Sequence, residues 1–328
     1  MKQIRTFAIL AAAALLLSAV GCVTSSTVGA SSNTDFSNPP PRAIEVDTTT
    51  FKPPAALPPL SLAKPATEPL LGGAIDWTSR VARAKGTGVL DPGNTNKAQA
   101  RLMAERAAVV VAQRNLLEII KGVRVDSDTK VENFMTQYDV IYSHVDGIVK
   151  GARQLGSAKY DSLAGTVEVE LEVPLYGAGG IEGAIEPALG TPGTADGNVS
   201  AAGVSPRVKE FFKQYAGLVL DGGNTGLNGS LFPKIYDDQG NLLLDTKDYA
   251  KYTGEAGSYA VQFVGALDQI LASPAFATQP LVLKVKEVRG KLGSDIVLSA
   301  LDADKLKWLK DGAKFLFNAG RFLVKLML

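Results

Sequence analysis

A strict alternation of apolar and charged residues near the middle of the chain constrains the fold most strongly. From Val167 to Val173 every second residue is Val or Leu, and the residues between them are Glu168, Glu170 and Glu172. Successive side chains of a strand point to opposite faces, so this pattern predicts a strand with one buried and one wet face. We interpret the three glutamates as a solvated face rather than as catalytic acids and bases, because all three point the same way.

A long segment before this strand predicts a helix that would cover it. The helix should run from Thr95 to Lys121, with Asn94 or Thr95 as its N-cap and Gly122 as its stop. It has two apolar stripes: one is Leu102, Val109, Leu116 and Ile120, and the other is Ala100, Ala104, Ala107, Ala108 and Val111. A helix that is apolar on two sides is expected to pack on two sides. Packing against a sheet is the simpler interpretation of the alanine stripe, and an interface with a neighbouring protein is the alternative.

These two elements define the fold class of a first domain, residues 74–176. The segment Tyr160 to Gly165 reads as the hairpin turn before the alternating strand. We therefore expect an α+β domain in which one long helix lies on an antiparallel sheet. A Gly-, Ala- and Pro-rich segment, residues 177–205, predicts a flexible linker after it.

Residues 206–328 predict a second, small α+β domain. The expected elements are a strand at 216–221, a hairpin at 232–245, a helix at 259–271, strands at 281–290 and 295–299, a helix from Asp302 to about 317, and a last strand at 321–328. The segment Asn318 to Gly320 should end the last helix. The alternative is that residues 302–328 form one basic amphipathic helix on a membrane surface.

The N-terminus has the layout of an export signal. Lys2 and Arg5 precede an apolar run, Phe7 to Val20, which is shorter than the roughly 20 residues of a membrane span. Cys22, the single cysteine of the chain, follows it directly. We predict a signal peptide at residues 1–21 and a Ser-, Thr- and Pro-rich disordered tether at 22–73. Secretion without a lipid and an uncleaved anchor are the alternatives.

Composition and charge exclude several classes of function. The formal net charge of the chain is +1, and removal of Lys2 and Arg5 with the signal lowers it by two, to −1. That charge offers no basic field for nucleic acid. With a single cysteine, the chain has no pair for an internal disulfide, although an exported protein would meet an oxidising compartment.

The candidate catalytic and metal-binding motifs of the sequence each lack a required residue. Gly217 and Gly222 have the spacing of a phosphate-binding loop, but Gly223 stands where lysine is required. A calcium loop with Gly240 at its sixth position would begin at Ile235, which has no carboxylate. His144 is the sole histidine, and no G-x-S-x-G motif is present. We therefore predict no catalytic residue, no cofactor and no metal.

Three aromatic residues are the candidates for a ligand groove. Trp77, Tyr138 and Tyr142 could line such a groove, but large aromatic side chains more often fill a core. We therefore favour core packing for all three.

Longer stretches of the sequence resemble known families. The segment "ARLMAERAAVVVAQRNLLEIIKGVRVDSDTKVENF", followed by "VDGIVKGARQ" and "TVEVELEVPL", resembles the Lpp-twenty family of outer-membrane lipoproteins over roughly Val81 to Leu175. The second domain resembles a module found in relatives of the flagellar assembly T family, whose aspartate pair is matched by Asp302 and Asp304. The stretch "LDGGNTGLNGS" departs from that module.

The resemblance and the N-terminus together imply a location and a class of function. The N-terminus resembles a bacterial lipoprotein signal, which implies that Cys22 carries acyl chains and becomes the mature N-terminus. Val23 rather than Asp after the cysteine favours the outer membrane, with the domains facing the periplasm. The resemblance implies an envelope protein that in some relatives is built into rings around the flagellar basal body.

Three functions of different classes remain open. The first is a structural or assembly lipoprotein of the envelope that works through protein partners or self-association. The second is a periplasmic binding module for glycan or lipid, which would need a deep pocket with convergent polar groups. The third is an enzyme, which would need clustered titratable groups in such a pocket. We favour the first.

Overall fold

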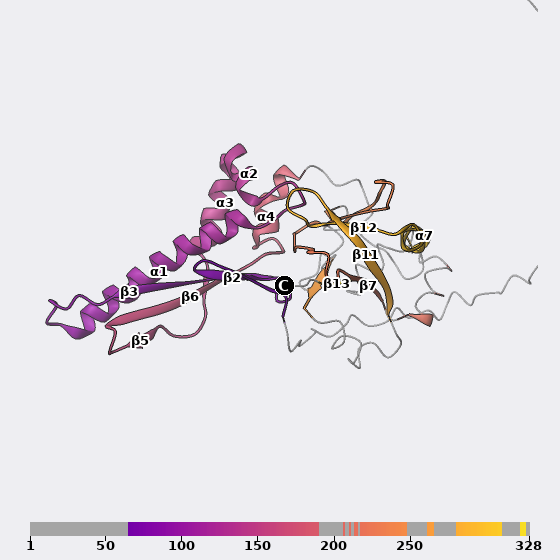
Figure 1. Cartoon of the computed structure of the whole chain (residues 1–328). Coiled ribbons are helices and arrows are strands. Elements are labelled where there is room, and N and C mark those ends of the chain that lie inside the picture. Colours follow the sequence, from indigo (N-terminus) through magenta and orange to yellow (C-terminus); the bar gives the residue numbers. More distant parts are fainter. Residues whose placement is uncertain are drawn as a thin grey trace, which may run out of the picture. The chain divides into compact units, whose positions relative to one another are not determined.

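The computed structural model describes residues 65–189, 206, 210, 213–215, 217–247, 261–265, 280–309 and 322–325. Residues 46–328 form one compact unit. Its described residues fold into a first part, residues 65–189, and a second part, residues 217–325 (Figure 1). The predicted signal at 1–21, Cys22, the tether up to residue 64 and positions 190–205 of the linker lie outside the described residues.

The first part contains an antiparallel sheet with the strand order β1-β2-β3-β6-β4, and β5 also pairs with β6. Its strands are β1 (Thr67–Leu70), β2 (Gly73–Asp76), β3 (Val81–Val89), β4 (Arg153–Gln154), β5 (Lys159–Asp161) and β6 (Thr166–Pro174). The alternating segment forms β6, with its Val and Leu side chains buried as predicted. The first described strand, β1, lies within the segment that the sequence assigned to the tether.

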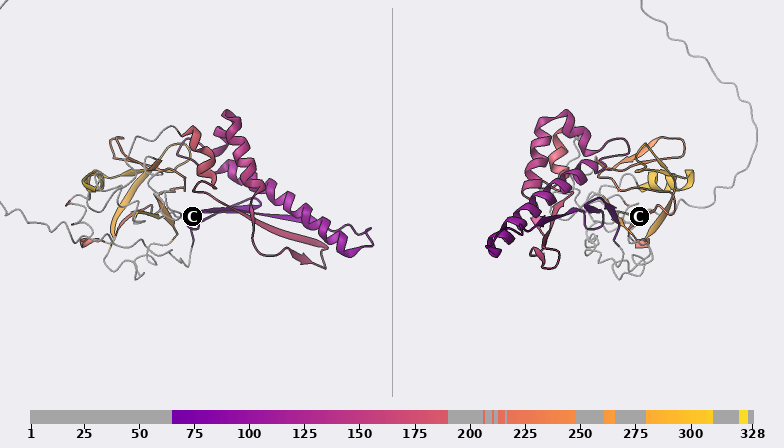
Figure 2. Two further views of the ribbon diagram at one scale, coloured as in Figure 1. Left: turned by 180° about the vertical axis from the view of Figure 1, so that it is seen from behind. Right: turned by 60° about the vertical axis from the view of Figure 1, so that its left-hand side comes forward.

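Helix α1 (Lys97–Gly122) lies along β3 and β6, as Figure 1 and the two further views of Figure 2 show. Its N-cap is Asn96, whose side-chain oxygen accepts the Gln99 backbone N–H at 3.1 Å. The helix thus begins slightly later than predicted and ends at the predicted glycine. A helix packed on an antiparallel sheet confirms the predicted α+β class.

Alanine lets α1 approach β3 closely. Four alanines at four-residue intervals form the buried alanine line: Ala100, Ala104, Ala108 and Ala112. On the strand, Gly86 and Gly88 face this line, and a Cβ on either would lie about 2 Å from the helix backbone, at 2.1 Å and 1.9 Å from its nearest atom. Ala100, Ala104 and Ala108 of the predicted stripe therefore form a helix–sheet contact, and the alternative that they form an interface with another protein is wrong.

The prediction that α1 packs on two sides holds for one end of the helix and is wrong for the other. Leu102 is 60% exposed, and Ala107 is exposed as well. Leu116 and Ile120, near the other end of the helix, are buried. Two helices without a sequence prediction, α2 (Val131–Gln137) and α3 (Asp139–Lys150), contact α1 and lie near that end (Figure 1). The second packed side is therefore present at one end of α1 only.

The chain after β6 continues into a short helix. Helix α4 (Ile181–Ile185) and the 3-10 turn η1 (Glu186–Ala188) fall in the first residues of the expected linker. Ile181 and Ile185 are fully buried. Described structure therefore extends beyond the boundary at residue 176.

The second part contains a mixed sheet with the strand order β10-β13-β7-β11-β12-β8-β9. Its elements are β7 (Leu218–Asp221), β8 (Lys234–Tyr236), β9 (Leu242–Asp245), β10 (Gln262–Val264), β11 (Leu281–Arg289), β12 (Asp295–Leu298), α7 (Ala300–Leu309) and β13 (Phe322–Lys325). The predicted hairpin is the antiparallel pair β8–β9. Strand β13 pairs in parallel with β7, so the alternative of one helix over residues 302–328 is wrong.

One predicted helix overlaps a strand. The sequence predicted a helix at 259–271, but Gln262–Val264 form β10, parallel to β13. Val261, Phe263 and Val264 are buried there. These β-branched and aromatic residues fit a pleated, buried surface beside β13, which explains why strand pairing outweighs helix formation. Residues 266–271 lie outside the described residues.

Candidate functional site

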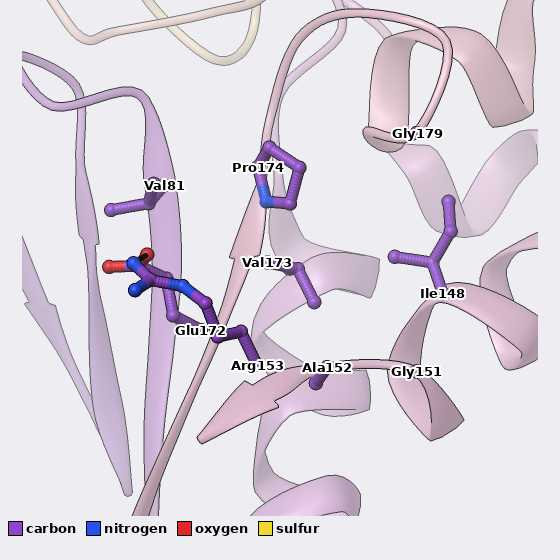
Figure 3. A pocket seen from close by; sticks show the side chains of 9 residues that line it. All are labelled: Val81, Ile148, Gly151, Ala152, Arg153, Glu172, Val173, Pro174 and Gly179. Atoms are coloured by element: carbon purple, nitrogen blue, oxygen red, sulfur yellow. Dashed lines mark hydrogen bonds and ion pairs between the residues drawn. The ribbon is translucent and has the colours of Figure 1, made fainter. Parts of the chain in front are cut away.

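A small hollow in the first part lies beside the C-terminal ends of α3 and β6. Its volume is about 350 Å³. The lining includes five apolar residues, Val81, Ile148, Ala152, Val173 and Pro174, and two charged ones, Arg153 and Glu172. Figure 3 shows the Arg153 guanidinium beside the Glu172 carboxylate, on a different side of β6 from Val173.

The charges of this hollow are already neutralised within the chain. Glu172 accepts a hydrogen bond from Arg83 Nε at 2.8 Å and another from Arg153. Arg83 also pairs with Asp76 at 3.2 Å. Acidic and basic side chains therefore alternate from one strand to the next, in the order β2, β3, β6 and β4. Burial alone would raise the pKa of Glu172, but the hydrogen bonds from the two arginines outweigh it and lower the pKa. A carboxylate with a lowered pKa is unsuited to act as a general acid.

The glutamates of β6 therefore differ from one another. Glu168 pairs with Lys85 at 3.3 Å on the wet face, and Glu170 is half-buried. Glu172 is only 7% exposed, so the solvated-face prediction is wrong for this residue. The physical reason is that two arginines from β3 and β4 cover its carboxylate, which the alternation of β6 alone does not reveal.

The α1–α2 loop, residues 123–130, makes several polar contacts with the second part. Its backbone carbonyls at Arg124 and Val125 accept the N–H groups of Leu231 and Phe232 at 2.9 and 2.8 Å. Further along the loop, the Ser127 carbonyl accepts the Leu292 N–H at 2.9 Å. The loop of the first part is thus hydrogen-bonded to two segments of the second.

Arg124 anchors the start of this loop. Its Nε donates to the Gly229 carbonyl at 2.7 Å, its Nη2 donates to Glu68, and its guanidinium lies 5.9 Å from the Trp77 ring centroid. The Trp77 indole N–H donates to the same Glu68 at 3.1 Å, and its ring meets Phe263 edge-on at 5.5 Å. Trp77 is fully buried, so this cluster joins both parts around one aromatic ring.

A second cluster surrounds Lys234 at the start of β8. Its ammonium pairs with Asp126 of the α1–α2 loop at 3.3 Å, and its backbone N–H donates to Asp295 at 3.0 Å. Burial raises the pKa of the Asp295 carboxyl to about 6, although the Lys234 N–H and ammonium lower it in part. The pKa of Asp126 is lowered because hydrogen bonds from the loop and from Lys234 outweigh burial.

The predicted aromatic candidates do not share a groove. Trp77 is buried, as the core interpretation expected. Tyr138 and Tyr142 are 45% and 49% exposed, so core packing is wrong for both. His144 lies exposed on α3. Of the Arg124 cluster, Trp77 was therefore identified from the sequence, but its charged partners Arg124 and Glu68 were not.

The acidic turn of the second part is a structural turn, as predicted. The Asp237 carboxylate accepts the backbone N–H groups of Gln239 and Asn241 at 3.1 and 2.8 Å, and Lys307 pairs with it at 3.4 Å. A hydrogen bond from the Asn241 side chain is the main reason that the pKa of Asp237 is lowered. Across the described ranges, no three His, Cys, Asp or Glu side chains gather where they could hold a metal ion.

The remaining candidates also hold local structure. The Asp221 carboxylate accepts the Gly223 N–H at 3.0 Å in the turn after β7, where a phosphate-binding loop had been considered. Asp302 pairs with Lys305 at 2.7 Å, and Asp304 lies 3.5 Å from Lys307. The aspartate pair therefore sits in a set of ion pairs along α7.

A comparison with protein families matches the second part. The family described as Treponema pallidum Tp0624, second domain, matches residues 217–324, from just before β7 into β13. No curated protein matches the chain. Among the helices that the structure describes, none combines the length and the apolar character needed to cross a membrane.

Proposed function

We propose that this chain is a lipid-anchored structural or assembly protein of a bacterial outer envelope. The lipid is carried by Cys22, and the folded domains face the periplasm. An export-signal layout that ends at the single cysteine supports the anchor. Two or more acyl chains hold a protein stably, whereas one chain holds it only marginally.

The observation that carries the structural role is that clustered charges are satisfied inside the chain. Glu172 is held by two arginines, Asp237 by backbone N–H groups and Lys307, and Asp126 by Lys234. A general acid or base needs a lone pair or a proton free for the substrate. Charged side chains that are paired within the chain favour a structural role over a catalytic one.

The kind of assembly is part of the proposal. The resemblance of residues 81–175 to the Lpp-twenty family, and of the second part to relatives of the flagellar assembly T family, favours a multi-subunit envelope complex, with flagellar structures as the first to examine. Self-association or a protein partner would then supply the contacts. The buried alanine line is not available for them, because it faces β3.

Site-specific cross-linking in intact cells tests this function. A photo-reactive amino acid at Tyr142 or Leu301, both of which are exposed, should give discrete products of higher mass. The matched control places the same group at the buried Ile141, next to Tyr142 on α3. If no exposed position gives such a product, and a turnover activity maps to the hollow beside Arg153, the enzyme hypothesis replaces this one.

The anchor has its own test. The mature wild-type protein should begin at Cys22 and carry acyl mass, and Cys22→Ala should release the protein from the membrane fraction. A wild type without acyl mass, or a variant that stays equally membrane-bound, contradicts the lipid assignment without touching the assembly proposal.

The hollow beside Arg153 favours one second candidate, a binding module for glycan or lipid. At about 350 Å³ it is at the small end of ligand sites, and its two charged groups are already paired. Ala152→Trp would fill it. Retained glycan or lipid binding in that variant would remove this candidate.

A further inference from the structure

The side of α1 that faces away from the sheet carries a second regular line of residues. Leu102, Arg106, Val110 and Arg114 follow one another at four-residue intervals, and we call them the outer line. They are offset by two residues from the buried alanine line, which is a rotation of about 200° on a helix with 3.6 residues per turn. The outer line therefore points directly away from β3.

The outer line is exposed and alternates between apolar and cationic side chains. Leu102 is 60% exposed and Val110 47% exposed, and both arginines are exposed. Met103 flanks the line and is 56% exposed. From Leu102 to Arg114 the line extends about 18 Å along the helix at 1.5 Å per residue. Each four-residue step turns the line by about 40° around the helix, so the four side chains span about 120° of its surface. They thus form a broad strip in which hydrocarbon and positive charge alternate.

The two arginines of this strip have no acid of their own. Within the part of the chain that the structure describes, neither Arg106 nor Arg114 forms an ion pair. The residues three and four positions from Arg106 are all apolar. Glu118, four residues after Arg114, pairs with Lys121 at 2.7 Å instead. On the opposite face of the first sheet, by contrast, Arg83 and Lys85 are paired with acids.

We propose that the outer line of α1 lies against the surface of an anionic phospholipid membrane. A strip of about 120° is as wide as the face that an amphipathic helix buries, and anionic headgroups would supply the negative charge that Arg106 and Arg114 lack. Leu102, Met103 and Val110 would enter the boundary between headgroups and acyl chains, as the apolar face of an interfacial helix does. The contact is independent of a lipid on Cys22.

The test uses the full chain with Cys22→Ala, which removes the acyl chains and the single native thiol. An environment-sensitive dye is attached through Val110→Cys on the outer line, or through Thr87→Cys on the exposed opposite face of the sheet. Vesicles of phosphatidylglycerol and phosphatidylethanolamine are compared with vesicles of phosphatidylcholine. The dye at position 110 should shift to the blue on the anionic vesicles only, and the dye at position 87 should not shift.

Removing the two positive charges gives the second arm. Arg106→Gln with Arg114→Gln should raise the lipid concentration that gives half of the full dye shift by about thirty-fold. This factor corresponds to about 1 kcal/mol for each arginine near an anionic surface. The charge-matched control, Lys85→Gln with Lys159→Gln, should change it less than two-fold, roughly the scatter expected for charges away from the membrane. The thermal unfolding midpoint of each variant is measured as well, so that weaker lipid binding is not confused with loss of folded protein.

The proposal is overturned by any of three results. The dye at position 110 does not respond to anionic vesicles, it responds equally to phosphatidylcholine, or the arginine and lysine pairs have the same effect. A response to polyglutamate without a response to vesicles would assign the strip to an acidic protein partner instead.

Discussion

Replacing Gly88 by alanine should push α1 away from β3, because the helix backbone already occupies the space of the new methyl group. A Cβ at this position would lie 1.9 Å from the Ala104 carbonyl oxygen and 2.9 Å from the Ala108 nitrogen. Both are main-chain atoms, so rotation of a side chain cannot relieve the overlap. Restoring an ordinary separation of about 3.5 Å requires a local displacement of about 1.5 Å.

That displacement sets the magnitude. Forcing an extra methyl group into a well-packed interior costs about 1 to 3 kcal/mol, and the value here should be near 3 because the whole alanine line must separate from the strand. Alanine recovers about 0.5 kcal/mol by restricting the unfolded chain. We expect the free energy of unfolding to fall by about 2 to 3 kcal/mol in Gly88→Ala.

Urea unfolding, followed by far-ultraviolet circular dichroism, measures this change. The matched control is Gly147→Ala in α3, where an added Cβ meets no atom within 4 Å. That variant should be more stable than wild type by up to about 1 kcal/mol, because alanine has the higher helix propensity. Adding Ala104→Gly to Gly88→Ala should not rescue it, because the overlap is with a main-chain oxygen.

Two results would refute this reasoning. One is a Gly88→Ala protein that unfolds at the same urea concentration as wild type. The other is recovery of wild-type stability on addition of Ala104→Gly, which would mean that side-chain bulk, and not the backbone approach, limits the contact.

Two further changes probe the contact between the parts. Gly290→Ala should lower the free energy of unfolding by about 2 kcal/mol, because its φ is +82° and its Cβ would lie 1.7 Å from Ser127 Oγ. Adding Ser127→Gly to this variant should recover part of the lost stability, as measured by urea unfolding. Burial raises the pKa of Asp295 from 3.8 to about 6, so the stability from this group is present below pH 3.8 and lost as the pH rises through about 6. Asp295→Asn should remove up to about 3 kcal/mol of this dependence, measured by urea unfolding from about pH 4 to pH 7, and an unchanged pH profile would contradict the assignment.

The elements whose signal is local were predictable from the sequence. The Val and Leu alternation of β6 and the capped segment of α1 each lie within one stretch of chain, and the structure confirms both. A further local signal was present but unused: Gly86 and Gly88 alternate in β3 with the same period as a strand. Combined with alanines at four-residue intervals, they identify the face of α1 that meets the sheet.

Features of the structure that depend on residues far away in the sequence were not predictable. Gln262–Val264 form a strand because β13, about 60 residues later, pairs with them. Glu172 is buried because Arg83 and Arg153 reach it from separate strands. The α1–α2 loop is polar and contains an Asp126 turn, in which the carboxylate accepts the Thr129 N–H at 2.9 Å. Nothing in that local pattern indicates hydrogen bonds to a segment a hundred residues away.

The native mass of the protein extracted from the envelope in mild detergent tests the proposed function most directly. Light scattering that separates protein from detergent should give a mass several times that of one chain for the wild type. A Cys22→Ala protein, recovered without detergent, should give a smaller species. A wild type that is strictly one chain per particle under the gentlest extraction, with no cross-linked product in intact cells, would contradict an assembly role.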